Sequence, residues 1–119
     1  MAKIIAAIDD MFFASKVNAV AQQVGATLIY AKTPDDIIAK AEAEQPSLII
    51  FDLNSVRSQP TETINSLKQN PELKSIPILG YLSHVQIDLQ QQALDAGCDK
   101  VVPRSVFAQN LSAILSGTI

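Results

Sequence analysis

Residues 48–55, "LIIFDLNS", form an apolar run that ends abruptly at an aspartate. Four consecutive apolar residues predict a strand that is buried on both faces, as in a parallel sheet covered by helices. Asp52 then stands where the strand leaves the sheet. Two interpretations stay open at this point: Asp52 is a simple turn or cap residue, or it is a reactive carboxylate at the edge of the sheet.

The alternation of apolar strands and amphipathic helices continues on both sides of this stretch. We expect strands at residues 3–8, 27–31, 48–51, 76–82 and 100–102, and helices at residues 12–24, 34–44, 61–69, 85–96 and 105–115. Thr33-Pro34-Asp35-Asp36 is a strong helix start, because it combines a cap, a first-turn proline and two acids. The pattern predicts an α/β fold: a doubly wound, five-stranded parallel sheet with the flavodoxin-like strand order 2-1-3-4-5.

Composition bounds the class of protein. The length predicts one domain over residues 1–119, with no output domain attached. A net charge of −3 argues against nucleic acid as a partner, and no apolar stretch is long enough to span a membrane. Asp9 and Asp10 lie too close to the N-terminus for a signal peptide, which has an apolar region there. The single cysteine, Cys98, excludes an internal disulfide, fits a reducing cytoplasm and is expected to be a small core residue.

Three acids follow two strands that are neighbours in this sheet. Asp9 and Asp10 come after the first strand and Asp52 after the third, at the point where the strand order reverses and where such sheets bind ligands. Like charges this close must be balanced by protons, a divalent cation or a basic side chain. Oxygen ligands in this number suit Mg²⁺, and Arg104 is the basic candidate.

Each candidate also has an ordinary structural interpretation. Asp9 or Asp10 can cap the following helix, and Arg104 can be a solvated surface charge. Ser83 can be a plain helix cap, since it precedes a predicted helix, and His84 is expected to be a surface residue.

Four stretches together resemble the receiver domain of two-component response regulators, most simply the single-domain chemotaxis type. They are "KIIAAIDD" (3–10), "LIIFDLN" (48–54), "SIPILGYLS" (75–83) and "AGCDKVV" (96–102), and the resemblance covers the whole chain. It implies that Asp52 accepts a phosphoryl group from a histidine kinase or phosphotransfer protein. It also implies that Mg²⁺ is held by Asp9, Asp10, Asp52 and the backbone carbonyl of Asn54. The protein would then be a cytoplasmic signalling protein, not an enzyme, that contacts a downstream protein partner.

The sequence departs from the family's pattern after the fourth and fifth strands. The family's lysine falls on Arg104 and its Thr/Ser switch on Leu82, with Ser83 one place later. Ser83 can serve only if the strand ends or bulges there, for which Gly80 offers a cause. The family's fifth-strand aromatic falls on Val101.

The loop after Asp52 departs as well, because residues 55–60 read Ser-Val-Arg-Ser-Gln-Pro and contain no glycine for an unusual backbone angle. Two receiver-like functions therefore stay open: a phosphorylated receiver with a modified response, and a degenerate receiver that binds a partner without phosphorylation. In both, the fourth helix, fifth strand and fifth helix would form the output surface. A small Mg²⁺-dependent phosphohydrolase is a more remote alternative. The halo-acid type of phosphatase has Asp-x-Asp after the strand, whereas this chain has Asp52-Leu53-Asn54.

Overall fold

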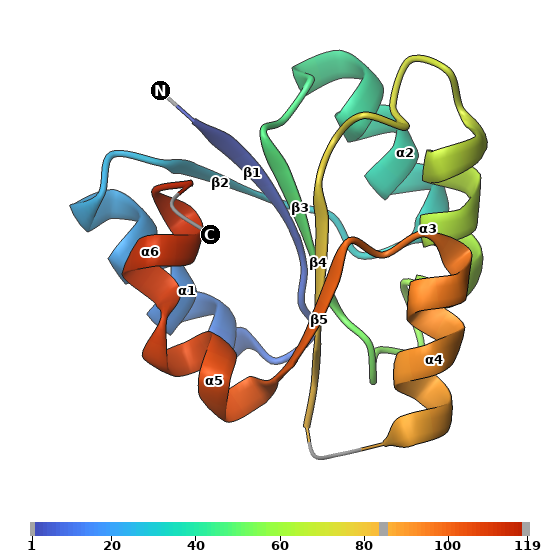
Figure 1. Ribbon diagram of the computed structural model, residues 1–119. Helices are drawn as coiled ribbons and strands as arrows, with labels where there is room; N and C mark the ends of the chain where they lie inside the picture. Colours follow the sequence, from blue (N-terminus) through green and yellow to red (C-terminus); the bar gives the residue numbers. More distant parts are fainter. Residues whose placement is uncertain (1, 84–85, 118–119) are drawn as a thin grey trace.

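The computed structural model describes residues 2–83 and 86–117 of the chain. Five strands alternate with helices along it (Figure 1). Their bounds are β1 (Lys3–Ala7), α1 (Met11–Gln23), β2 (Thr27–Tyr30), α2 (Pro34–Glu44), β3 (Leu48–Asp52), α3 (Pro60–Gln69), β4 (Ile78–Leu82), α4 (Ile87–Ala96), β5 (Lys100–Pro103), α5 (Arg104–Gln109) and α6 (Leu111–Leu115).

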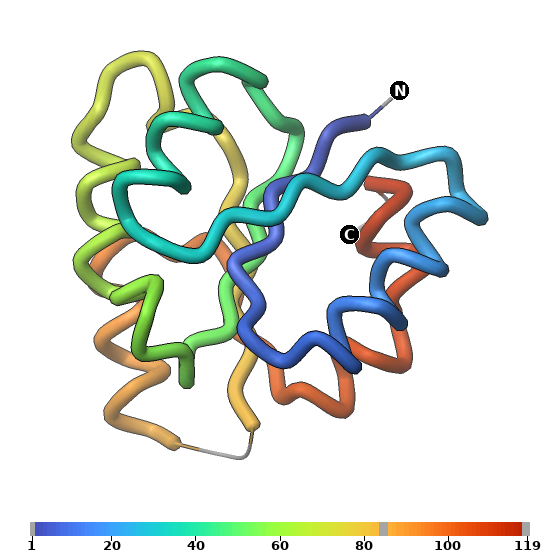
Figure 2. The backbone as a smooth tube through the Cα atoms, turned by 180° about the vertical axis from the view of Figure 1, so that it is seen from behind, coloured from blue at the N-terminus to red at the C-terminus, as the bar shows by residue number. Residues whose placement is uncertain are grey.

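The strands form one parallel sheet in the order β2-β1-β3-β4-β5, which confirms the predicted topology. Helices α1, α5 and α6 cover one face of the sheet, and α2, α3 and α4 cover the other (Figure 1). Figure 2 shows the same two layers from behind, with the start of β1 at the opposite end of the sheet from the end of β4. The carboxyl ends of the strands therefore share one edge, away from the N-terminus.

Alternate residues of each central strand enter two separate apolar cores. In β3, Ile50 packs with α1, α5 and α6, while Ile49 and Phe51 pack with α2, α3 and α4. All three side chains are fully buried, as the unbroken apolar run predicted. Burial on both faces fixes the register of β3, so Asp52 is held at the end of a rigid strand.

Asp10 and Thr33 fix the starts of the first two helices. The Asp10 carboxylate caps α1, and the Thr33 hydroxyl accepts a hydrogen bond from the backbone N–H of Asp36, as the helix-start pattern predicted. The last predicted helix, residues 105–115, is in fact two helices that meet at Asn110. The Asn110 side chain donates a hydrogen bond to the carbonyl of Val106 at 2.7 Å, a local bond that competes with a continuous helix.

Strand β4 runs without a bulge. It stays in register with β3 through Tyr81 and with β5 through Leu82, so Gly80 does not disturb the pairing. Gly80 instead leaves room for Leu53, whose Cδ1 atom would lie 2.8 Å from a Cβ added at this position. Among the described residues α4 begins at Ile87 with Gln86 as its cap residue, so the helix-cap interpretation of Ser83 is wrong. His84 and Val85 lie outside the described residues.

Candidate functional site

Asp9, Asp10 and Asp52 come to one edge of the sheet, as the topology predicted. Ala7 of β1 pairs in register with Phe51 of β3; Asp52 follows Phe51 as the last residue of β3, and Asp9 and Asp10 follow one residue after β1. Each of the three carboxylates, however, has its own hydrogen-bond partner within the chain.

Asp10 serves both as a helix cap and as an ion-pair partner. One carboxylate oxygen, Oδ1, accepts hydrogen bonds from the backbone N–H groups of Phe12 and Phe13 at 3.0 and 3.3 Å. The other, Oδ2, accepts from Arg104 Nη2 at 3.0 Å. The Arg104 bond, followed by the backbone bonds, holds the pKa of Asp10 below its usual value. The cap interpretation is thus right for Asp10, but it accounts for only one of its oxygens.

Arg104 is the first residue of α5 and reaches back to the start of α1. Its guanidinium carbon lies 4.2 Å from the centre of the Phe13 ring, a cation–π contact that orients the fork toward Asp10. The predicted basic candidate therefore does face the acid residues. A planar guanidinium that is held by both a ring and a carboxylate is not equivalent to a lysine.

Asp9 is held by a residue that sequence reasoning passed over. The hydroxyl of Ser55 donates a hydrogen bond to Asp9 Oδ2 at 2.7 Å and accepts one from the backbone N–H of Ser58. Ser55 is buried, so the β3–α3 loop closes against the β1–α1 connection. The left-handed backbone that a glycine would favour falls on Gln59, with φ 43°. The position of Ser55 immediately after Asn54 was the only available sequence signal.

Asp52, like Asp9, is partly buried, whereas Asp10 is exposed. Its Oδ1 accepts a hydrogen bond from the backbone N–H of Asn54 at 2.9 Å. Burial, joined by the negative charges of Asp9 and Asp10, raises the pKa of Asp52 above its usual value. The Asn54 N–H and the positive charge of Arg104 act in the opposite direction. Within the described residues, Asp52 is the one acid of the three with no side-chain partner.

Asn54 links the loops that follow β3 and β4. Its side-chain oxygen accepts from both the backbone N–H and the hydroxyl of Ser83, at 2.8 and 3.0 Å. Its side-chain nitrogen donates to Gln86 Oε1 at 2.7 Å. Ser83 therefore connects to Asp52 through Asn54. The predicted role of Asn54 used its backbone carbonyl, whereas the contacts seen here use its amide side chain and its N–H.

The described side chains at this edge are of the type that binds a metal ion, but they are not arranged to bind one as they stand. Carboxylate oxygens are the ligands that Mg²⁺ prefers. Among residues 2–83 and 86–117, however, no three His, Cys, Asp or Glu side chains are close enough to hold a metal ion as they stand. Asp10 is engaged by Arg104 and Asp9 by Ser55. A cation would have to replace at least the Arg104 contact.

Tyr81 is a further residue of this edge that the sequence analysis did not single out. Its Cα pairs in register with that of Asp52, and its side chain is only 1% exposed. Its ring stacks on Phe107 of α5, with centroids 4.8 Å apart and planes within 8°. Its hydroxyl is buried and has no hydrogen-bond partner in the described structure. A tyrosine within an otherwise apolar strand was the signal for it.

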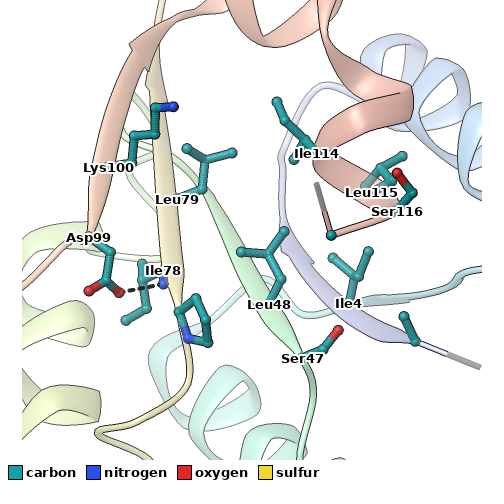
Figure 3. A pocket seen from close by; sticks show the side chains of 13 residues that line it. Ile4, Ser47, Leu48, Ile78, Leu79, Asp99, Lys100, Ile114, Leu115 and Ser116 are labelled. Carbon is teal, nitrogen blue, oxygen red and sulfur yellow. Dashed lines mark hydrogen bonds between the residues drawn. The ribbon is translucent and has the colours of Figure 1, made fainter. Parts of the chain in front are cut away.

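A cavity of about 510 Å³ lies at the amino edge of the sheet, between the strands and α6, and is lined mainly by apolar side chains (Figure 3). None of the predicted site residues lines it.

Cys98 is a small core residue, as expected, and burial raises its pKa to about 11. No helix in the described residues is both long and apolar enough to cross a membrane.

Comparisons with solved structures define the fold. The chain is similar to a response regulator from Hahella chejuensis, with a TM-score of 0.88, 17% identity and coverage of 100% of this chain and 96% of that one. For the chemotaxis response regulator CheY4 of Vibrio cholerae, the TM-score is 0.85 and the identity 21%, with coverage of 100% of this chain and 99% of that one. For the phosphorylated cyanobacterial phytochrome response regulator RcpA, the TM-score is 0.81 and the identity 21%, with coverage of 98% of this chain and 89% of that one. The protein therefore has the fold of the response-regulator receiver domain.

Sequence comparisons are less informative. No protein-family model matches the chain. A curated relative from Thiocystis violacea, described as an uncharacterized 76.5 kDa protein in the phbC 3' region, is 26% identical over 104 residues. The match covers 87% of this chain but 15% of that protein, so the chain spans only a small part of its relative.

Proposed function

We propose that the protein is a receiver in two-component phosphorelay signalling, in which Asp52 accepts a phosphoryl group from a histidine kinase or phosphotransfer protein. The observation that supports this most directly is the position of Asp52 at the end of β3, held by a backbone N–H and bound to no other side chain in the described residues. Its raised pKa makes the carboxylate more basic, and hence a better nucleophile, than an ordinary surface aspartate.

Mg²⁺ is the proposed cofactor, with ligands from Asp9, Asp10, Asp52 and the backbone carbonyl of Asn54. When bound, it would neutralise the acids and shield the oxygens of the transferring group. One structural neighbour is a response regulator in its Mn²⁺-bound form, which supports a divalent cation at a site of this fold. In this chain Arg104 would leave Asp10 as the cation binds, because both need the same carboxylate.

Protein partners are the proposed donors and receivers of the signal. Large exposed apolar side chains lie on segments that follow β1, β3 and β4, namely Met11, Phe12, Val56 and Ile87. Exposed apolar groups near the acids suit docking of a phosphoryl donor. Leu94 of α4 and Val106 of α5 are also partly exposed, and we assign them to the surface that contacts the downstream partner.

Treatment with acetyl phosphate and Mg²⁺, followed by intact mass spectrometry, tests the proposal. The wild-type chain should gain the mass of one phosphoryl group, and Asp52→Asn should not. Asp88→Asn is the matched control, since Asp88 is an exposed acid at the start of α4, and it should behave like wild type. Equal labelling of wild type and Asp52→Asn would exclude Asp52 as the acceptor.

A second candidate function is a receiver-like module that binds its partner without phosphorylation. The observation that favours it is that Arg104 and Ser55 bind Asp10 and Asp9, so the chain's own side chains occupy these two carboxylates. If this candidate is correct, no mass is gained with acetyl phosphate, and partner binding is the same with and without Mg²⁺. Loss of partner binding in Asp52→Asn would argue against it.

A further inference from the structure

Tyr81 places a hydroxyl group in the core next to the strand that ends in Asp52. The side chain is 1% exposed, and its hydroxyl has no hydrogen-bond partner among the described residues. A buried polar group left unpaired costs about 1–3 kcal/mol. Phenylalanine would fill the same space without that cost. The hydroxyl is therefore the part of this residue that packing does not explain.

The direction of the Tyr81 side chain follows from the sheet. Tyr81 and Asp52 are in-register neighbours on parallel strands, so their side chains leave the sheet on the same face. On that face Tyr81 packs among Phe13 of α1 and Phe107 of α5, with ring centroids 5.4 and 4.8 Å away. Phe13 is also the ring under Arg104. The Tyr81 ring thus packs against the ring that lies under Arg104.

The charges of the site reach this hydroxyl. Burial is the main reason why the pKa of Tyr81 is raised, and the negative charge of Asp52 is the next largest cause. A tyrosine with a raised pKa stays protonated, so it is available as a donor and not as an anion. Added negative charge at Asp52 would attract that donor more strongly.

We propose that the Tyr81 hydroxyl donates a hydrogen bond to the anionic group that forms on Asp52, and that the stacked ring couples this bond to α5. The inference rests on the proposed function, because it needs an anion on Asp52. The unpaired hydroxyl would then be a donor held ready for a partner that is present only in the phosphorylated state.

Helix α5 is joined to the acid edge at two points. Arg104 at its start binds Asp10, and Phe107, three residues later, stacks on Tyr81. A shift of the Tyr81 ring therefore moves the contact that holds α5, and with it the exposed Val106. In this chain Val101 stands on β5 where the family has an aromatic residue. Tyr81 on β4 would therefore provide the aromatic link to α5.

Beryllofluoride with Mg²⁺ is the probe, and its affinity is measured by ¹⁹F NMR titration in wild type, Tyr81→Phe and Tyr30→Phe. Tyr81→Phe keeps the stacked ring and removes only the hydroxyl. Its affinity should fall about ten-fold or more, since a hydrogen bond to a charged group is worth about 1.5–3 kcal/mol. Its stability without the probe should equal or exceed that of wild type, an outcome that a purely structural hydroxyl would not give. Tyr30→Phe is the control, because the Tyr30 hydroxyl already donates to the carbonyl of Ala14.

A second readout follows Tyr81 itself. The chain has two tyrosines and no tryptophan, so Tyr81 is the sole tyrosine emitter in Tyr30→Phe. Its emission should change on saturation with the probe. If the probe binds wild type but binds Tyr81→Phe with equal affinity, this inference is wrong while the proposed function stands. If the probe does not bind wild type at all, the proposed function fails and this inference fails with it.

Discussion

The two halves of the carboxyl edge are built in different ways. On the β1 and β3 side, two of the three acids make local contacts: Asp10 caps the helix that follows it, and Asp52 accepts from the N–H two residues later. The third, Asp9, accepts from Ser55 in the loop after β3. On the β4 and β5 side, the contacts are long-range: Ser83 binds Asn54, and Arg104 binds Asp10 across 94 residues of sequence. The positions of the acids are set by the strands that precede them. The positions of Ser83 and Arg104 are set by packing between strands and helices.

This difference indicates that residues on the β4 and β5 side can be substituted while the three acids keep their positions. Strand β3 is buried on both faces, so Asp52 keeps its position whatever follows β4 and β5. The groups on the β4 and β5 side are held by the Tyr81–Phe107 stack, by two hydrogen bonds from Ser83 to Asn54, and by the Arg104–Asp10 ion pair. Perturbing that side should therefore alter stability and response without displacing the acids.

The largest expected effect comes from the stack. Phe107→Ala should lower the free energy of unfolding by about 3–5 kcal/mol, because Phe107 is fully buried against Tyr81 and Phe13. Urea denaturation measures the change. Phe12→Ala is the control: Phe12 is 93% exposed, so its loss should cost less than about 0.5 kcal/mol. Equal effects of the two variants would mean that α5 is not anchored as described.

The next effect tests the close approach of β4 to the residue after Asp52. Gly80→Ala should cost about 1–3 kcal/mol, because the new Cβ would meet Leu53 Cδ1 at 2.8 Å. The change is measured by thermal denaturation. Leu53→Ala removes the obstructing atoms, so the double variant should be more stable than the sum of the two single changes allows. Strict additivity would contradict the predicted clash.

Asp52→Asn should stabilise the protein in metal-free buffer, so that its Tm lies above that of wild type. Burial and two negative neighbours raise the pKa of Asp52, so the ionised carboxylate costs stability in the folded state. That cost is complete above the folded-state pKa and disappears as pH falls through that pKa toward 3.8, the ordinary pKa of an aspartate. The advantage of the variant should shrink over the same window in a series of melts. An advantage that grows with acidification has the wrong sign for this explanation.

The smallest expected effect on stability is that of Arg104→Ala, within about 1 kcal/mol, since the Arg104–Asp10 pair is partly exposed. Its effect on metal binding should be clearer. Without Arg104, Asp10 is free for a cation, so added Mg²⁺ should raise Tm more in the variant than in wild type. Arg104→Lys keeps the charge and should lie between them. A smaller Mg²⁺ effect in Arg104→Ala would show that Arg104 does not compete with the metal.

The fold was predictable because its signals are local and repeated. The unbroken apolar run at residues 48–51 predicts a doubly buried strand, and Thr33-Pro34 predicts the start of α2. The division of the last helix at Asn110 was missed, since a single asparagine in a helical pattern does not reveal its backbone bond to Val106. Gly80 was offered as a cause of a bulge or strand end before Ser83; β4 ends at Leu82 without a bulge. Gly80 instead makes room for Leu53, which follows β3, and the sequence does not reveal this contact.

The placement of the three acids at one edge was predictable, but their contacts were not. Strand order alone brings Asp9, Asp10 and Asp52 to one edge. The bond from Ser55 to Asp9 joins residues 46 positions apart in the sequence, and no periodicity encodes it. The unpaired hydroxyl of Tyr81 is a property of the folded core, so only the structure shows it.

The most direct test of the central claim, that Asp52 is the acceptor on this edge, is the backbone-amide NMR spectrum of the chain titrated with beryllofluoride and Mg²⁺. The N–H of Asn54 donates to Asp52 at 2.9 Å, so its signal should shift strongly in wild type. That shift should be absent in Asp52→Asn and retained in Asp88→Asn. An Asn54 signal that does not move in wild type at a saturating probe concentration, or that moves equally in Asp52→Asn, would contradict the account.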